Sequence, residues 1–285
     1  CSDERERLGA ERRKKYAARP TDAIDTRQER SMKNANGLST AIVVVLAALA
    51  AWLQTDAQAA AASCAVHSTK TMTPVVELYT SEGCSSCPPA DRWLSRLKAE
   101  PDVVALAFHV DYWDRLGWKD RFASPAYTRR QAQQQASNGA RFSYTPQIVV
   151  DGADRNDWPG ITAFTQRNAP AATVALTLVR DGAHVSATVV PGPSAPKHLA
   201  AYWAVTEQAY ETTVKAGEND GATLRHDYVV RDYRTVAPWP AQAGVEETLA
   251  YDFGSAADAA HPRALNLVVV DAGNGRPVQA VKLGC

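Results

Sequence analysis

The stretch ELYTSEGCSSCPPAD, residues 77–91, places two cysteines three positions apart, directly after an apolar run. The run Val75–Thr80 is rich in β-branched and aromatic residues and predicts a strand, whereas residues 91–100 carry apolar side chains at helical spacing. Residues 103–112, VVALAFHVDY, are nearly continuous in apolar side chains, as expected for a strand buried on both faces. Strand, helix and strand in this order predict a βαβ unit with parallel pairing.

The rest of the chain changes character at about residue 170. Before it, helix formers follow Pro125, a strand is predicted at Gln147–Val150, and a short helix is predicted over residues 161–169. After it, short segments of alternating polarity are separated by turn residues, which favours a β-sandwich. We therefore expect two domains, an α/β domain over residues 60–169 and a β-rich, sandwich-like domain over residues 170–285.

The first 59 residues have the composition of an export signal and an upstream extension. Residues 1–31 are dense in charge and poor in apolar side chains, so we expect disorder and doubt that they are translated. Residues 32–59 begin at a methionine and combine a lysine, an apolar run and an Ala-Gln-Ala site, which predicts a signal peptide cleaved after Ala59. The apolar run, about 16 residues, is shorter than the roughly 20 that span a bilayer. We expect a periplasmic or secreted protein with no stable membrane span after cleavage, and a lipid-modified Cys64 is the less favoured alternative.

Charge and cysteine content narrow the possible partners and pairings. Lysine plus arginine and aspartate plus glutamate both number 31, so no basic surplus predicts nucleic-acid binding. Four cysteines remain after cleavage, and four cysteines allow three pairings. Cys84 and Cys87 are close enough in sequence to pair with each other, which leaves Cys64 to pair with Cys285. Such disulfides persist outside the cytoplasm.

Three chemistries are compatible with Cys84 and Cys87. A structural zinc site needs four ligands, and the sequence has neither a second C-x-x-C nor a paired set of histidines. A redox pair needs two thiols at the mouth of a βα unit, where the helix N-terminus stabilises a thiolate. A permanently oxidised staple is the third interpretation. We favour the redox pair because the strand, C-x-x-C, helix and strand follow one another.

His109 and Asp111 lie at the end of the strand predicted over residues 103–112 and share one face of it. They could relay protons during disulfide exchange. His109 could instead join Cys84 and Cys87 as a copper ligand, or simply shape the strand end. In the second domain, the acidic residues of GENDG favour a solvated turn over a calcium site.

Several long motifs resemble one family of predicted secreted bacterial proteins. They are LYTSEGCSSCPPAD (78–91), ALAFHVDYWDRLGWKDRFASPAYTRRQ (105–131), YTPQIVVDG (144–152) and GENDGATLRHDYVVR (217–231). The family is domain of unknown function 1223, placed in the thioredoxin-like superfamily. The resemblance implies a thioredoxin-like fold, with Cys84 as the more exposed attacking thiol, Cys87 as the resolving thiol and Pro146 as a cis-proline beside them.

The motif also departs from the usual oxidoreductase pattern. Gly83 stands where a tryptophan is usual, and residues 85–86 are Ser-Ser. Pro88-Pro89 fit only the first turn of a helix, so the helix is expected to begin near Cys87 or Pro88, with Cys84 just outside it.

The sequence therefore predicts an exported thioredoxin-like protein, without a cofactor, that exchanges thiols and disulfides through a C-x-x-C pair. Its partners would be exported proteins or small-molecule thiols and disulfides. The alternatives are a copper-binding protein and a non-catalytic binding module with a static disulfide.

Overall fold

The structure is a computed structural model that describes residues 64–164, 169–254 and 258–285. The predicted extension 1–31 and the signal peptide 32–59 lie outside the described residues. The predicted helix 161–169 lies partly outside them, and its residues 161–164 are not helical. None of the helices in the described part is long and apolar enough to cross a membrane.

Strands make up most of the described chain, and their bounds follow the order of the sequence. The strands are β1 (Cys64–His67), β2 (Val75–Thr80), β3 (Val104–His109), β4 (Gln147–Val150), β5 (Ala153–Asp154), β6 (Val174–Asp181), β7 (His184–Pro191), β8 (His198–Glu207), β9 (Tyr210–Thr213), β10 (Thr223–His226), β11 (Val229–Pro240), β12 (Glu247–Asp252), β13 (Arg263–Asp271) and β14 (Pro277–Leu283). The two α-helices of the described residues are α3 (Pro88–Ser95) and α4 (Pro125–Ser137).

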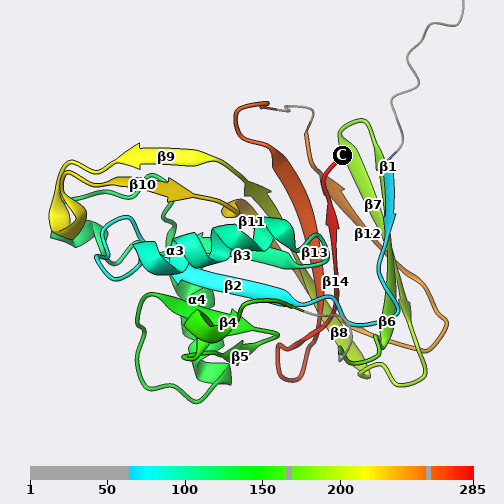
Figure 1. Ribbon diagram of the computed structural model, residues 1–285. Helices are drawn as coiled ribbons and strands as arrows, with labels where there is room; N and C mark the ends of the chain where they lie inside the picture. Colours follow the sequence, from blue (N-terminus) through cyan, green and yellow to red (C-terminus); the bar gives the residue numbers. More distant parts are fainter. Residues whose placement is uncertain (1–63, 165–168, 255–257) are drawn as a thin grey trace, which may run out of the picture. The chain divides into compact units, whose positions relative to one another are not determined.

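The strands form one large mixed sheet, one four-stranded sheet and one hairpin (Figure 1). The eight-stranded sheet has the order β14-β13-β8-β11-β3-β2-β4-β5. Within it β2 and β3 are parallel, β11 meets β3 in parallel at Val229, and the other neighbours are antiparallel. The four-stranded sheet has the order β1-β6-β7-β12, and β9 pairs only with β10.

Three apolar clusters hold these layers together. On one face of β2, β3 and β4, α3 buries Trp93 and Leu94. On the opposite face α4 contributes Tyr127 to a cluster that continues onto β8, β11, β13 and β14. The third and largest cluster fills the space between the four-stranded sheet and β8, β13 and β14. Residues 60–285 accordingly form one compact unit.

The prediction of a thioredoxin-like α/β domain followed by a separate β-rich, sandwich-like domain was wrong. The first half does contain a parallel β2–β3 pair joined through α3, but this pair is not the centre of a small α/β sheet. The free edge of β3 is taken by β11 from the second half, and β8, β13 and β14 extend the same sheet. Only α3 and α4 cover it in the described chain, so the fold is a mostly β structure built on large mixed sheets.

Most individual elements were predicted from the sequence, with two exceptions in the second half. Strands at Val75–Thr80 and Gln147–Val150 are confirmed with the same bounds. The segment LRHDYVVRDY, expected as one strand, is divided between β10 and β11 where Tyr228 takes a positive φ of 58°. The short strand β9 was not predicted. Together β9, the 3-10 helix η5 (Gly217–Asn219) and β10 form a hairpin, residues 210–226, that we call the arm.

Candidate functional site

Cys84 and Cys87 lie in the loop that joins β2 to α3, and they form a disulfide. Their Cα atoms are 5.4 Å apart. Cys87 is the N-cap of α3, and Pro88 and Pro89 occupy the first turn, where a missing backbone N–H removes no helical hydrogen bond. The prediction that the helix begins near Cys87 or Pro88, with Cys84 outside it, is confirmed.

The disulfide is buried, although the residues between its cysteines are not. Both cysteines have an exposed fraction of 0%, whereas Ser85 and Ser86 are exposed. Cys84 is therefore not the more exposed thiol that the family resemblance implied. A group that reacts with Cys84 must first displace something that covers it.

Polar groups surround the sulfur of Cys84. Thr145 Oγ1 donates to Cys84 Sγ at 3.3 Å, and Ser86 Oγ lies 3.4 Å from the same sulfur. The indole N–H of Trp113 in turn donates to Thr145 Oγ1 at 2.8 Å. The Thr145–Pro146 peptide bond is cis. Trp113 also explains Gly83, because a Cβ at that position would lie 3.1 Å from the Cβ of Trp113.

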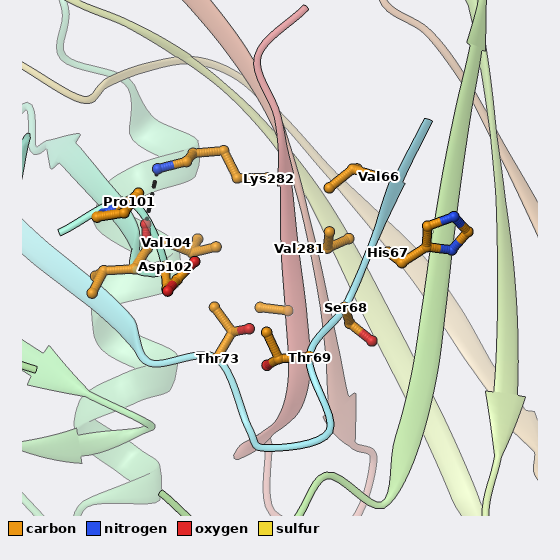
Figure 2. Close-up of a pocket in the computed structure, with 12 residues that line it drawn as sticks. Val66, His67, Ser68, Thr69, Thr73, Pro101, Asp102, Val104, Val281 and Lys282 are labelled. Atoms are coloured by element: carbon orange, nitrogen blue, oxygen red, sulfur yellow. Dashed lines mark hydrogen bonds between the residues drawn. The ribbon is translucent and has the colours of Figure 1, made fainter. Parts of the chain in front are cut away.

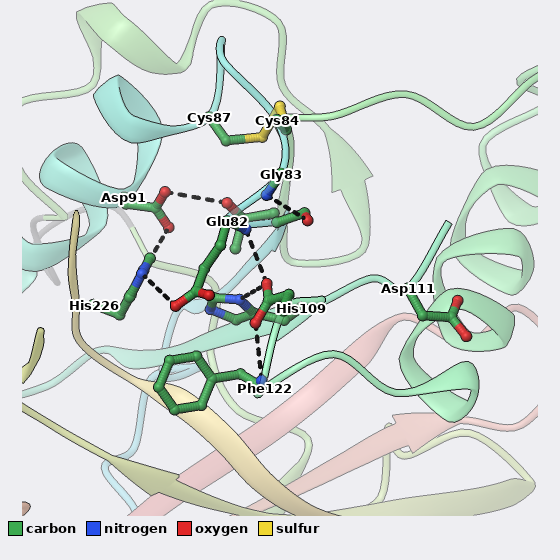
Figure 3. Close-up of polar contacts among 12 residues, drawn as sticks. Glu82, Gly83, Cys84, Cys87, Asp91, His109, Asp111, Phe122 and His226 are labelled. Atoms are coloured by element: carbon green, nitrogen blue, oxygen red, sulfur yellow. Dashed lines mark hydrogen bonds and ion pairs between the residues drawn. A yellow bond between two sulfur atoms is a disulfide. The ribbon is translucent and has the colours of Figure 1, made fainter. Parts of the chain in front are cut away.

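A cluster of buried charged side chains lies beneath this loop (Figure 3). His109 Nδ1 pairs with Asp120 Oδ2 at 2.7 Å. His226, at the base of the arm, pairs with Glu82 at 3.4 Å through Nε2 and with Asp91 at 3.9 Å through Nδ1. The cluster thus joins the loop before Cys84, helix α3, the end of β3 and the arm.

Backbone and indole donors complete the cluster. The backbone N–H of Glu82 donates to Asp120 Oδ2 at 2.9 Å, and the N–H of Phe122 donates to Oδ1 at 2.8 Å. Trp118 Nε1 donates to Glu82 Oε2 at 2.8 Å. These bonds fix the carboxylate of Glu82 two residues before Cys84.

The pKa values within the cluster show which groups are charged. Burial lowers the pKa of His226, but the carboxylates of Asp91 and Glu82 outweigh this effect and raise it to about 9. Burial raises the pKa of Asp120, yet the charge and hydrogen bond of His109, with backbone donors, lower it to about 2. The pKa of Glu82 is likewise lowered, because its hydrogen bonds outweigh burial. His226 is therefore a buried cation between buried carboxylates at neutral pH.

The structure does not bring His109 and Asp111 to the disulfide. His109 points at Asp120, and Figure 3 places Glu82 and Gly83 between it and the two cysteines. Asp111 accepts a hydrogen bond from the hydroxyl of Thr128 on α4 and points away from the cluster (Figure 3). Within the described ranges no three His, Cys, Asp or Glu side chains are arranged to hold a metal ion, so the alternative copper set of Cys84, Cys87 and His109 is not assembled.

The tip of the arm contacts the cysteine loop directly. Asn219 Nδ2 donates to the carbonyl oxygens of Glu82, at 2.8 Å, and of Cys84, at 3.0 Å. Glu218 Oε2 accepts from the backbone N–H of Ser85, at 3.1 Å, and from its hydroxyl, at 2.8 Å. These contacts join residues more than 130 positions apart in the sequence.

Sequence reasoning missed four residues of this site: Glu82, Asp120, Glu218 and Asn219. Glu82 is close to Cys84 in the sequence, which was a usable signal. Asp120 had none, and the GEND motif predicted only a solvated turn. His226 and the GEND motif were noticed as a group, yet only the fold shows that both ends of the arm meet the same loop.

The second pair, Cys64 and Cys285, is also joined by a disulfide, with its Cα atoms 6.2 Å apart. A cavity of about 110 Å³ lies near β1 and β14 (Figure 2). Its lining includes Thr73 and Val104, at the starts of β2 and β3, so it lies at the opposite end of these strands from Cys84. It is smaller than the roughly 300 Å³ at which ligand pockets begin.

Comparison with known proteins places this geometry in a family. No curated protein matches the chain. A solved protein of Agrobacterium tumefaciens, a structural genomics target, is 28% identical with a TM-score of 0.56, and the match covers 75% of this chain and 95% of that one. HBP35 of Porphyromonas gingivalis is 14% identical with a TM-score of 0.54 over 76% of each chain, a similarity of fold alone. The model of the family "Protein of unknown function (DUF1223)" matches residues 75–270, and the chain therefore belongs to the DUF1223 family.

Proposed function

We propose that the protein exchanges thiols and disulfides through Cys84 and Cys87. The observation that carries this proposal is the polar environment of the Cys84 sulfur, which receives a hydrogen bond from Thr145 and has the hydroxyl of Ser86 beside it. Hydrogen bonds to a thiolate favour the charged form and lower its pKa. A disulfide that serves only as a staple gains little from hydroxyl donors at one sulfur.

The two cysteines differ in their surroundings, which assigns them different roles. Cys84 lies outside α3 and has the hydroxyl donors, so it is the thiolate that reacts with the partner. Cys87 is the N-cap of α3, where the partial positive charge of the helix terminus stabilises the thiolate that forms as the disulfide opens.

The reaction is a pair of sulfur displacements. From the reduced pair, the Cys84 thiolate attacks one sulfur of a partner disulfide, the partner's S–S bond breaks, and one partner thiolate leaves. The Cys87 thiolate then attacks Cys84 Sγ, the Cys84–Cys87 bond forms, and the second partner thiolate leaves. Two electrons pass from the cysteine pair to the partner disulfide, which is the oxidant. With a partner dithiol as the reductant, the same steps run in reverse.

An oxidising compartment outside the cytoplasm fits this chemistry. Two disulfides within residues 64–285 are typical of exported proteins, and residues 32–59 have the pattern of a cleaved signal peptide. We therefore propose a periplasmic or secreted location, with polypeptide thiols and disulfides as partners.

The test is a trapping experiment combined with a redox titration. Cys87→Ser cannot resolve a mixed disulfide, so it should accumulate partners bonded to Cys84. Cys84→Ser is the matched control and should trap none. The Cys84–Cys87 couple should also have a potential above about −300 mV, the upper bound typical of structural disulfides. Equal, empty traps in both variants, with a potential below that bound, would show that the disulfide is a static staple.

Thr145→Val provides a second test that leaves both cysteines in place. It removes the hydroxyl at the Cys84 sulfur but keeps the side-chain shape. The pKa of Cys84 in the Cys87→Ser background should rise, because the thiolate loses a donor. An unchanged pKa would remove the observation on which the proposal rests.

A further inference from the structure

The arm is attached to the rest of the protein in a way that separates its base from its tip. Its strands β9 and β10 pair only with each other and not with the eight-stranded sheet (Figure 1). At the base, His226 is buried in the charge cluster. At the tip, Gly217 and Gly221 take positive φ values of 75° and 79° on either side of residues 218–220.

The tip engages the polar groups of the cysteine loop that its own turns leave available. The carbonyl oxygens of Glu82 and Cys84 accept from Asn219, and Ser85 donates to Glu218. Glu218 and Ser85 are exposed to solvent, so this part of the contact competes with water. The loop itself is anchored from below by the buried side chain of Glu82.

Exchange at Cys84 requires an attacking sulfur to reach Cys84 Sγ, and neither cysteine is exposed. Either the loop or the arm tip must therefore move. The tip is held by side-chain hydrogen bonds from Glu218 and Asn219, whereas the loop is fixed by backbone turns and the buried cluster. The tip is the part that separates with less loss of contact.

We propose that the arm tip is a reversible cover, and that the loop groups it satisfies are the docking groups for an extended polypeptide partner. This proposal rests on the exchange function proposed above. The vacated loop offers two carbonyl acceptors two residues apart, at positions 82 and 84, and an N–H and a hydroxyl donor at Ser85. An extended peptide presents N–H and C=O groups along one edge with the same two-residue repeat.

Glu218 and Asn219 are then the residues that decide which partners reach the disulfide. A polypeptide replaces their hydrogen bonds as it displaces them, so the loop groups stay satisfied. A small thiol offers no such edge, so it reacts only in the fraction of molecules whose tip is already open. The cover therefore selects polypeptide thiols and disulfides over small ones.

The first experiment measures the rate at which dithiothreitol reduces Cys84–Cys87 in the oxidised full chain. In the double variant Glu218→Ala/Asn219→Ala this rate should rise about tenfold or more, because the open fraction increases. The matched control is Glu211→Ala/Arg225→Ala, which removes an exposed ion pair from the strands of the arm without touching the loop. The control should reduce at the wild-type rate, and an unchanged rate in the double variant would overturn the cover.

The second experiment uses a reduced, unfolded polypeptide that carries two cysteines as the reductant. The wild type should prefer it to dithiothreitol at equal thiol concentration, and the double variant should lose most of that preference. If both reductants gain equally in the variant, the tip is a cover without selectivity and the docking groups are wrong.

These outcomes are distinct from a failure of the exchange function. Reduction by dithiothreitol reports access to the disulfide whether or not a natural partner exists. Trapped partners on Cys87→Ser combined with equal reduction rates would keep the exchange and reject the cover. Empty traps combined with a faster rate in the double variant would keep the cover, reject its role in exchange, and thereby overturn the docking proposal.

Discussion

His226→Gln tests whether the buried charge cluster fixes the arm to the cysteine loop. His226 has an exposed fraction of 2% and lies between the carboxylates of Glu82 and Asp91. Glutamine keeps a polar side chain of similar length but cannot carry the positive charge. Both carboxylates would then be buried without a cation, and breaking a buried pair in this way costs about 3–5 kcal/mol.

The loss should depend on pH in a defined direction. The pKa of His226 is raised from an ordinary 6.5 to about 9, so its protonated form stabilises the folded state. That contribution is fully present below pH 6.5 and disappears as the pH rises through 9. A difference of this size corresponds to about 3 kcal/mol. The wild type should therefore lose about this much stability between pH 6 and pH 10 relative to the variant.

The assay is urea unfolding followed by tryptophan fluorescence, with the disulfides intact, at pH 6, 8 and 10. The difference in the free energy of unfolding between wild type and His226→Gln should be largest at pH 6 and smallest at pH 10. His184→Gln is the control, because His184 pairs with Asp252 on an exposed surface, where such pairs contribute about 0–1 kcal/mol. The same difference at all three pH values would refute the assignment of a buried imidazolium.

Three further predictions concern the framework around the site. Arg130→Met should lower the free energy of unfolding by about 3–5 kcal/mol, because it leaves a buried glutamate unpaired, whereas Arg155→Met at an exposed pair should cost about 0–1 kcal/mol; similar urea midpoints would contradict this. Replacing Cys64 and Cys285 together by serine should cost about 3–5 kcal/mol, since their bond closes a loop with a sequence separation of 221, and calorimetry with an unchanged Tm would argue against it. Leu267→Ala should cost about 2–5 kcal/mol through a cavity between the two sheets, measurable by the same urea titration.

Local features of the site could be predicted from the sequence because neighbouring residues determine them. Pro88 and Pro89 fix the start of α3 regardless of the rest of the fold, since proline fits only the first turn of a helix. The nearly continuous apolar run that contains β3 identified a strand buried on both faces, and its parallel pairing with β2 followed from the intervening helix.

The overall architecture could not be predicted in the same way, because it depends on a strand edge. Nothing in the sequence of β3 shows whether its free edge ends the sheet or accepts β11, which follows it by more than 100 positions. The parallel contact at Val229 and Ala107 turns two expected domains into one sheet. An edge with unpaired N–H and C=O groups accepts any strand whose pattern fits, so pairing partners are set by the whole chain.

The buried cluster was missed for a related reason. Glu82, Asp120 and His226 come from three separate segments, and each has an ordinary polar neighbourhood in the sequence. A charged residue is usually exposed, so burial of several together becomes visible only when their segments are packed. Glu218 and Asn219 were likewise assigned to a solvated turn because local residues alone favour one.

The bond between Cys64 and Cys285 turns residues 64–285 into a covalent ring. A protease that cuts such a ring once, for example at the exposed turn near Val245, opens it without releasing either piece. Nicked molecules would keep their mass on a non-reducing gel and separate into fragments only after reduction. The protein can therefore tolerate a single cleavage in an exposed turn while its two sheets stay together.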